Sequence, residues 1–211
     1  MFLQQLTVGP LDVNCYLAAD VDSKEALCID PGGNAHDIFK ILNNNNLKLK
    51  YIINTHGHFD HIGGNGALRE KTGAILAIHA DDATLLKDAM SHAVFFGVTS
   101  KGSPEPDMLL KDNDMLAIGD IKIKIIHTPG HTRGGISILI DKFLFTGDTL
   151  FAGSIGRTDL PGGSYEQIIT SIKNKLLIFD EEFRVYPGHG PSTTVGEEKR
   201  GNIFITGDLD E

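Results

Sequence analysis

The fold of this chain is decided by the stretch Tyr51-Ile52-Ile53-Asn54-Thr55-His56-Gly57-His58-Phe59-Asp60-His61. Its apolar beginning predicts a buried strand, which leads directly into three histidines and one aspartate within six positions. His56, His58 and Asp60 alternate with a period of two, so an extended or looped backbone can turn all three toward one point. The alternative is a solvated histidine-rich loop, but such a loop needs no buried strand ahead of it.

The side-chain types in this stretch favour an open metal site. Imidazole nitrogens and carboxylate oxygens, with no thiolate beside them, suit a hydrolytic Zn, Fe or Mn centre better than a closed structural zinc site. The spacing also differs from the helical H-E-x-x-H zinc motif, whose histidines lie at i and i+4. We therefore expect the ligands to lie on a loop after a strand.

Three later stretches repeat this arrangement of a strand followed by a ligand-type residue. His131 follows the apolar run 121–126 across a Pro-Gly turn, Asp148 follows the run 143–145, and His189 follows the run 183–186. Taken alone, Asp148 is more typical of a turn. However, sheets packed in layers bring such loops to one edge, so the four stretches together predict one shared site.

Length and composition indicate an ordinary globular protein. The chain has 211 residues, of which 41% are hydrophobic and 22% charged, and these values are typical of one domain. No apolar run reaches the ~18 residues of a membrane span, and the N-terminus lacks a signal-peptide pattern, so we expect a cytoplasmic protein. The net charge of −9, without a Lys/Arg cluster, argues against a nucleic-acid or membrane-surface partner.

The rest of the chain predicts mixed α and β structure. Its two cysteines, Cys15 and Cys28, have neither metal-type spacing nor the number of a disulfide framework, so we expect reduced, buried thiols. The segment 91–110 has little periodicity and is interpreted as a long loop, either a cover over a pocket or a surface excursion. Helices are expected at 34–42, 65–71, 80–90 and 164–177.

Two polar residues near the predicted strand ends need separate comment. Asp30 either makes the turn before Pro31 or orients a metal-bound histidine from behind, and the residue types allow both. His79 follows the apolar run 74–78 as a single histidine at a strand end. A histidine in that position is more often structural, so we leave it out of the predicted site.

Taken together, these motifs resemble the metallo-β-lactamase superfamily, in its hydrolase branch with seven metal ligands. The resemblance covers nearly the whole chain. It implies an αββα four-layer sandwich, in which two mixed β-sheets are flanked by helices and the metals lie at one edge. The motifs that carry it are Thr55–His61, Thr128–Thr132, Thr146–Thr149 and Tyr186–Gly190.

Within the superfamily, the chain is most similar to the short bacterial form of the glyoxalase II proteins, the hydroxyacylglutathione hydrolases. The segments 14–16, 30–32, 151–159 and 196–200 carry this likeness. Only residues 190–211 follow His189, so we expect a single domain over 1–211 without the C-terminal helical domain that binds glutathione in longer members.

The resemblance implies two divalent metal ions, with zinc expected first and iron or manganese as alternatives. By this resemblance one ion is held by His56, His58 and His131, and the other by Asp60, His61 and His189, while Asp148 bridges the two. Asp60 and Asp148 are the residues expected to take part in catalysis. The implied reaction is attack of a metal-bridging hydroxide on a thioester of the S-D-lactoylglutathione type.

Two other activities of the same fold remain open at this point. A persulfide dioxygenase would use one iron on His56, His131 and Asp148, and a lactonase would use both metals on a cyclic ester. Arg157 is interpreted either as a partner for a substrate carboxylate or as part of a structural Gly-Arg-Thr-Asp turn. The expected partner is a small thioester, and the oligomeric state stays open.

Overall fold

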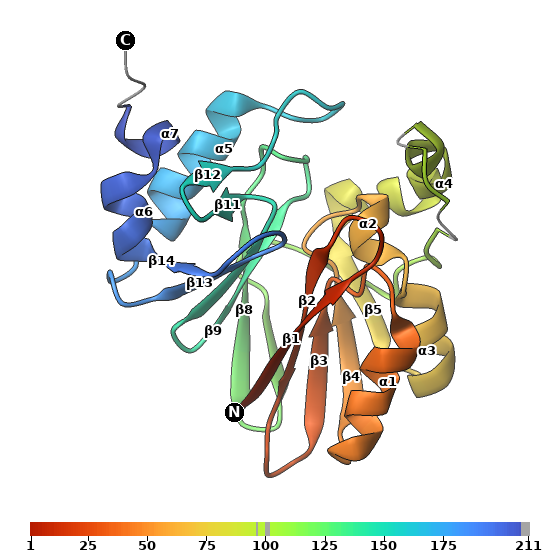
Figure 1. Ribbon diagram of the computed structural model, residues 1–211. Helices are drawn as coiled ribbons and strands as arrows, with labels where there is room; N and C mark the ends of the chain where they lie inside the picture. The colour runs from red at the N-terminus through yellow and green to blue at the C-terminus, as the bar shows by residue number, and fades with distance from the viewer. Residues whose placement is uncertain (96, 100–101, 208–211) are drawn as a thin grey trace.

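Two facing β-sheets with helices on their outer sides make up this protein (Figure 1). The computed structural model describes residues 1–95, 97–99 and 102–207. Each main sheet has six strands, and a separate two-stranded ribbon accompanies the second sheet. The arrangement confirms the predicted αββα sandwich of two mixed sheets with flanking helices.

The first sheet has the strand order β1-β2-β3-β4-β5-β6. The pairs β1/β2 and β2/β3 are antiparallel, whereas β3, β4, β5 and β6 run parallel. Parallel strands place their carboxyl ends at the same edge, which is where the chain leaves β4 for the histidine-rich stretch. The strands are β1 (Phe2–Val8), β2 (Val13–Ala19), β3 (Glu25–Ile29), β4 (Lys48–Ile53), β5 (Ile75–His79) and β6 (Met108–Leu110).

The second sheet has the order β14-β13-β10-β9-β8-β7, in which only β10 and β13 pair in parallel. Because β10 and β13 run parallel, their carboxyl ends lie at the same side of the sheet. The loops that follow them carry Asp148 and His189. The strands are β7 (Met115–Ile118), β8 (Ile121–His127), β9 (Ile136–Ile140), β10 (Phe143–Gly147), β13 (Arg184–Pro187) and β14 (Thr193–Thr194), and the ribbon is β11 (Leu150–Phe151) with β12 (Ser154–Ile155).

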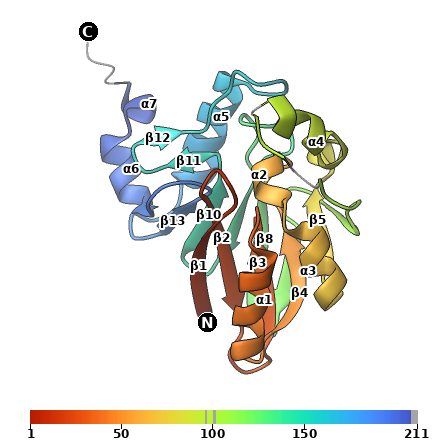
Figure 2. The ribbon, with the colours of Figure 1, turned by 45° about the vertical axis from the view of Figure 1, so that its right-hand side comes forward.

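Helices cover both outer faces, as the turned view shows (Figure 2). On the first sheet lie α1 (Ala35–Asn44) and α3 (Asn65–Thr72), and on the second lie α5 (Tyr165–Ser171), α6 (Val195–Gly201) and α7 (Ile203–Thr206). A π-helical turn, Ile172–Leu176, continues α5, so the predicted helix 164–177 is found with a changed pitch at its end. The one-turn helix α2 (Phe59–Ile62) lies at the strand ends.

The core between the sheets depends on alternation along buried strands. All seven residues of β2 are buried: Tyr16 faces the second sheet, whereas Cys15 faces α1. At the centre of the inner layer, Phe145 is fully buried, stacks on Tyr186 at 5.3 Å and meets Tyr16 edge-on at 5.1 Å. Three apolar layers result, one between the sheets and one under the helices of each face.

Some predicted elements were wrong in extent. The helix expected at 80–90 is a 3₁₀ turn, Ala80–Asp82, followed by α4 (Leu85–Phe95). The expected loop 91–110 is therefore helical up to residue 95 and ends in β6, an edge strand too short to show periodicity. Residues 96, 100 and 101 of that segment lie outside the described residues.

Cys15 and Cys28 are free and buried, as predicted, with their sulfur atoms 3.5 Å apart. Burial raises the pKa of the Cys15 thiol well above its ordinary value. Such a thiol stays protonated, so it does not act as a nucleophile.

Among the described residues, no helix is long and apolar enough to cross a membrane.

We expect Phe145→Ala to lower the free energy of unfolding by about 3–5 kcal/mol, because it leaves a cavity where both sheets meet. Urea unfolding followed by circular dichroism measures this change. The matched control is Ile178→Ala, since Ile178 is 67% exposed and its removal should cost less than about 0.5 kcal/mol. Equal losses for the two variants would show that the inner layer is not the main core.

Candidate metal centre

Four chain segments from both sheets bring the predicted ligands to one edge. The loop after β4 carries His56 and His58, and His58 is the extended residue before α2. The period of two ends there, because Asp60 and His61 lie on the single helical turn of α2. The loops after β8, β10 and β13 supply His131, Asp148 and His189.

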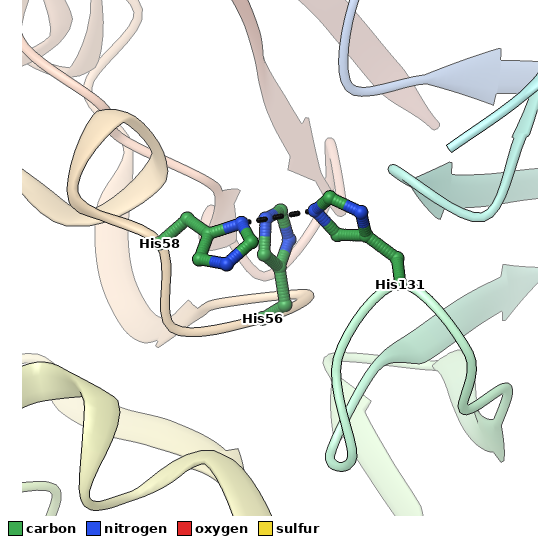
Figure 3. Close-up of side chains that lie close together, drawn as sticks. All are labelled: His56, His58 and His131. Carbon is green, nitrogen blue, oxygen red and sulfur yellow. Dashed lines mark hydrogen bonds between the residues drawn. The ribbon is translucent and has the colours of Figure 1, made fainter. Parts of the chain in front are cut away.

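The first group of ligands consists of three histidines (Figure 3). His56 and His58 come from one loop and face His131 on another, with Nδ1 of His58 2.9 Å from Nε2 of His131. The ring of His56 lies 4.7 Å from that of His58 and 4.8 Å from that of His131. Three imidazoles thus surround one point.

The second group consists of Asp60, His61 and His189. Oδ2 of Asp60 lies 3.6 Å from Nε2 of His61 and 3.4 Å from Nε2 of His189. Asp148 lies between the two groups. Its Oδ1 is 3.4 Å from Nε2 of His61, and its Oδ2 is 3.6 Å from Nε2 of His131 and 3.7 Å from Nε2 of His189. All seven predicted residues therefore meet, and Asp148 contacts both groups.

Three buried atoms of this cluster have no hydrogen-bond partner in the described chain: Nε2 of His56, Nε2 of His61 and Oδ1 of Asp148. Burying a polar atom without a hydrogen-bond partner costs free energy, so these atoms indicate that a ligand binds here. Imidazole nitrogens and carboxylate oxygens in this arrangement fit divalent cations. The residues present are therefore suited to holding metal ions.

Hydrogen bonds behind the histidines direct their free nitrogens into the site. Thr55 Oγ1 donates to Asp30 Oδ2 at 2.6 Å, so it accepts from Nδ1 of His56 at 3.1 Å. The same carboxylate oxygen lies 3.0 Å from Nδ1 of His61. Both histidines consequently present Nε2 to the centre. Asp30 has a left-handed φ of 49°, so both interpretations of this residue hold: it makes the turn and it orients ligands.

Arg157 contributes through its backbone. Its carbonyl oxygen accepts a hydrogen bond from Nδ1 of His131 at 2.8 Å, which leaves Nε2 of His131 for the site. Its guanidinium makes two 2.8 Å hydrogen bonds to Asp159, and this pairing lowers the pKa of Asp159 to about 2. The side chain is thus engaged in the structural turn, which is the second of the two predicted interpretations.

The prediction missed three buried residues that hold the loops of the candidate ligands. Nδ2 of Asn14 donates to the carbonyls of Pro187 at 3.0 Å and Gly190 at 2.8 Å, on either side of His189. The hydroxyl of Tyr16 donates to the same Pro187 carbonyl at 2.6 Å. The signal was an asparagine within an otherwise apolar strand. The third missed residue is Asp82, a fully buried carboxylate on the turn after β5.

A third cluster of possible ligands, His79, Asp81 and His127, lies nearby. The two imidazole rings stack at 4.1 Å with an interplanar angle of 8°. Stacked rings direct their lone pairs side by side instead of toward one ion. Nε2 of His127 also bonds the Arg133 carbonyl at 2.9 Å, and Nδ1 of His79 accepts from the Asp81 amide. We therefore interpret this cluster as structural, in keeping with the expectation for His79.

Electrostatics separate the two groups of ligands. Burial lowers the pKa of His61, but the carboxylates of Asp148, Asp60 and Asp30 outweigh burial and raise this pKa to about 10. Burial and the neighbouring imidazoles hold the pKa of His56 well below its ordinary value. In the metal-free protein at neutral pH, His61 is therefore protonated, whereas His56 is neutral and ready to bind.

We expect metal uptake to release a proton and to strengthen as pH rises from 6 to 9. A metal must displace the proton of His61. Each unit of pH below the pKa of about 10 therefore lowers the affinity for the metal roughly tenfold. Calorimetric titration with Zn²⁺ in buffers of different ionisation enthalpy counts the protons. An affinity that does not change over this range would contradict the charge state assigned to His61.

We expect Asn14→Asp to loosen the His189 loop, because a carboxylate would face two carbonyl oxygens that now accept hydrogen bonds. Elemental analysis should show loss of about one metal per chain at unchanged secondary structure. The matched control is Asn45→Asp, since the exposed Asn45 also donates to one carbonyl, that of Ile41. Equal metal content in the two variants would count against this role.

Comparison with known proteins agrees with the fold and the site. Residues 8–189 match the family model described as the metallo-beta-lactamase superfamily, and the chain belongs to this superfamily. It is therefore a member of a superfamily of metal-dependent hydrolases. The predicted resemblance is confirmed at this level.

Two relatives match over nearly their full length. The hydroxyacylglutathione hydrolase GloC of Haemophilus influenzae is 37% identical over 209 residues, which cover 97% of this chain and 98% of GloC. The probable metallo-hydrolase YqgX of Bacillus subtilis is 36% identical over 208 residues, 97% of each chain.

Solved structures share the same arrangement. The BLEG-1 B3 metallo-beta-lactamase has a TM-score of 0.90 and 37% identity, covering 97% of this chain and 100% of that one. TTHA1623 in a di-iron-bound form has a TM-score of 0.88 and 34% identity, covering 95% and 99%. ETHE1 from Myxococcus xanthus has a TM-score of 0.81 and 29% identity, covering 98% and 85%.

Proposed function

We propose that this protein is a two-metal hydrolase that cleaves a thioester of the S-D-lactoylglutathione type. The observation that carries the proposal is the set of buried, unpartnered ligand atoms on His56, His61 and Asp148, which lie across both groups. The likeness to the hydrolase GloC over 97% of the chain supports the choice of substrate class.

In this proposal His56, His58 and His131 would hold the first ion, and Asp60, His61 and His189 the second. Asp148 would be a ligand shared by both ions, which is supported by its contacts of 3.4–3.7 Å with histidines of both groups. Zinc is the first choice for both positions. Iron is the main alternative, because TTHA1623 has been solved in a di-iron-bound form.

The bound ions would supply a hydroxide near neutral pH and polarise the thioester carbonyl. The protein's own residues hold this arrangement in place. Burial raises the pKa of Asp60, but His61 and His189 outweigh burial and keep this pKa below its ordinary value, so the carboxylate stays ionised and can accept a hydrogen bond from the attacking group. The carbonyl of Arg157 and the carboxylate of Asp30 keep His131 and His61 aimed at the site.

No protein nucleophile is needed in this mechanism. Both cysteines of the chain lie in the layer between the first sheet and its helices, among residues such as Ile38 and Leu42. Hydrolysis would add the hydroxide supplied by the bound ions to the thioester carbon and break the carbon–sulfur bond, giving a carboxylate, a thiolate and one proton released to solvent.

One alternative activity has an observation in its support. The likeness to ETHE1 is the reason to consider a persulfide dioxygenase, which would use a single iron on His56, His131 and Asp148. The hydrolase is preferred because His58, Asp60, His61 and His189 converge on the same site without being needed by a single iron. A lactonase would use the same seven ligands on a cyclic ester, so only substrates distinguish it.

A single domain over residues 1–211, a cytoplasmic location and the absence of nucleic-acid and membrane partners are inferred from the sequence. The glutathione portion of the substrate is inferred from GloC. Metal identity follows from the experiment below.

We expect protein purified without added metal to contain about two metals per chain and to hydrolyse S-D-lactoylglutathione. His58→Ala should lower metal content and turnover together, because it removes one of three ligands of the first ion. Elemental analysis and a thioester assay on the same sample measure both. His36→Ala, at an exposed histidine on α1, is the control and should change neither quantity.

Other outcomes would redirect the proposal. One iron per chain with oxygen uptake on glutathione persulfide, and no thioester turnover, would identify the dioxygenase. Turnover of lactones but not thioesters would identify the lactonase. Full activity of His58→Ala after loss of one metal would contradict the two-metal mechanism.

A further inference from the structure

Asp82 is a buried carboxylate that makes three hydrogen bonds to the loops of the first ligand group. Its Oδ2 accepts from the Gly57 amide at 3.1 Å and from the Thr132 hydroxyl at 2.7 Å. Its Oδ1 accepts from the Gly134 amide at 2.7 Å. Asp82 is fully buried, and burial raises the pKa of its carboxyl group, while the three donors oppose that rise by stabilising the carboxylate.

The three donors lie next to the histidines of the first group. Gly57 is the residue between His56 and His58, and Thr132 follows His131. These loops come from different sheets, since one follows β4 and the other follows β8. A single carboxylate on the turn after β5 therefore joins the two loops that must approach each other to form the three-histidine site.

The contact is close because glycines allow it. A Cβ on Gly134 would lie 2.6 Å from the Asp82 amide nitrogen, and one on Gly57 would lie 2.6 Å from Cβ of Leu85. The stacked pair of His79 and His127 forms a second tie between the same parts of the chain. The turn after β5 thus supports both loops from behind.

We propose that Asp82 is a positioning residue that sets the separation of His56 and His58 from His131, and thereby the affinity of the first metal position. All three of its hydrogen bonds run to the loops of the first group, whereas Asn14 holds the His189 loop of the second. Loss of the Asp82 carboxylate should therefore weaken the binding of the first ion and leave the binding of the second nearly unchanged. This inference rests on the proposed two-metal centre.

The test measures Asp82→Asn in two backgrounds that each retain one ligand group. His189→Ala keeps the first group intact, and His58→Ala keeps the second. Metal-free protein is titrated with Co²⁺ in competition with a coloured chelator, so the readout is affinity and not turnover. Asp82→Asn should weaken Co²⁺ about 10–100-fold beside His189→Ala and less than about 3-fold beside His58→Ala.

Equal weakening in both backgrounds, or none in either, would overturn the inference. Asn14→Asp is the matched comparison at the second group and should show the opposite preference. If wild-type protein binds two ions and Asp82→Asn has no selective effect, the inference fails while the proposed function stands. If wild-type protein binds a single ion that Asp82→Asn weakens, the two-metal function fails while the role of Asp82 stands.

A second pair of variants covers the case in which Asp82→Asn does not fold. Thr132→Val removes one hydrogen bond to Asp82 with little change in shape, and Thr132→Ser keeps the hydroxyl. Beside His189→Ala, the valine variant should weaken Co²⁺ by about 3–10-fold and the serine variant should restore the affinity. Equal affinities for valine and serine would overturn the proposal.

Discussion

The main constraint on this structure is that seven candidate metal ligands are held together at one edge of two sheets. Several of their nitrogen and oxygen atoms are buried without partners in the described chain, and His56 is surrounded by other imidazoles that oppose its protonation. In the metal-free protein these unpartnered atoms and crowded imidazoles are costly, even though the carboxylates of Asp60 and Asp148 attract the protonated His61. Packing and hydrogen bonds elsewhere must therefore hold the cluster together.

The hydrogen bonds that hold the cluster together come from a small number of buried polar residues. Asp30 and Thr55 act on His56 and His61, Asn14 acts on the His189 loop, and Asp82 joins the two loops of the first group. Each of them bonds to backbone groups, a hydroxyl or a ring nitrogen behind the site, and therefore sets geometry without occupying the site. This division leaves Nε2 of His56, Nε2 of His61 and Oδ1 of Asp148 unpartnered among the described residues and available to metal ions.

Glycines next to the ligands make the approach of the loops sterically possible. Gly188 lies beside His189, and a Cβ there would come within 2.3 Å of Oδ1 of Asp148. Gly147 precedes Asp148 with a left-handed φ of 48°, and a Cβ would come within 2.3 Å of Thr55 Oγ1. The glycines directly before Asp148 and His189 are thus a requirement of close packing at this edge.

The sequence by itself indicated the buried strands ahead of the site, the seven candidate ligands and the family, because these depend on short-range patterns: apolar runs, a spacing of two, and glycine beside histidine or aspartate. Where the pattern was too short, at β6 and β14, or ambiguous, at Asp30 and Arg157, only the tertiary structure decided. The bracing contacts were also decided there, since Asn14 reaches Gly190 across 176 positions and Asp82 reaches Thr132 across 50. A hydrogen bond between residues so far apart leaves no periodic trace in the chain, because it depends on how two sheets pack and not on the residues nearby.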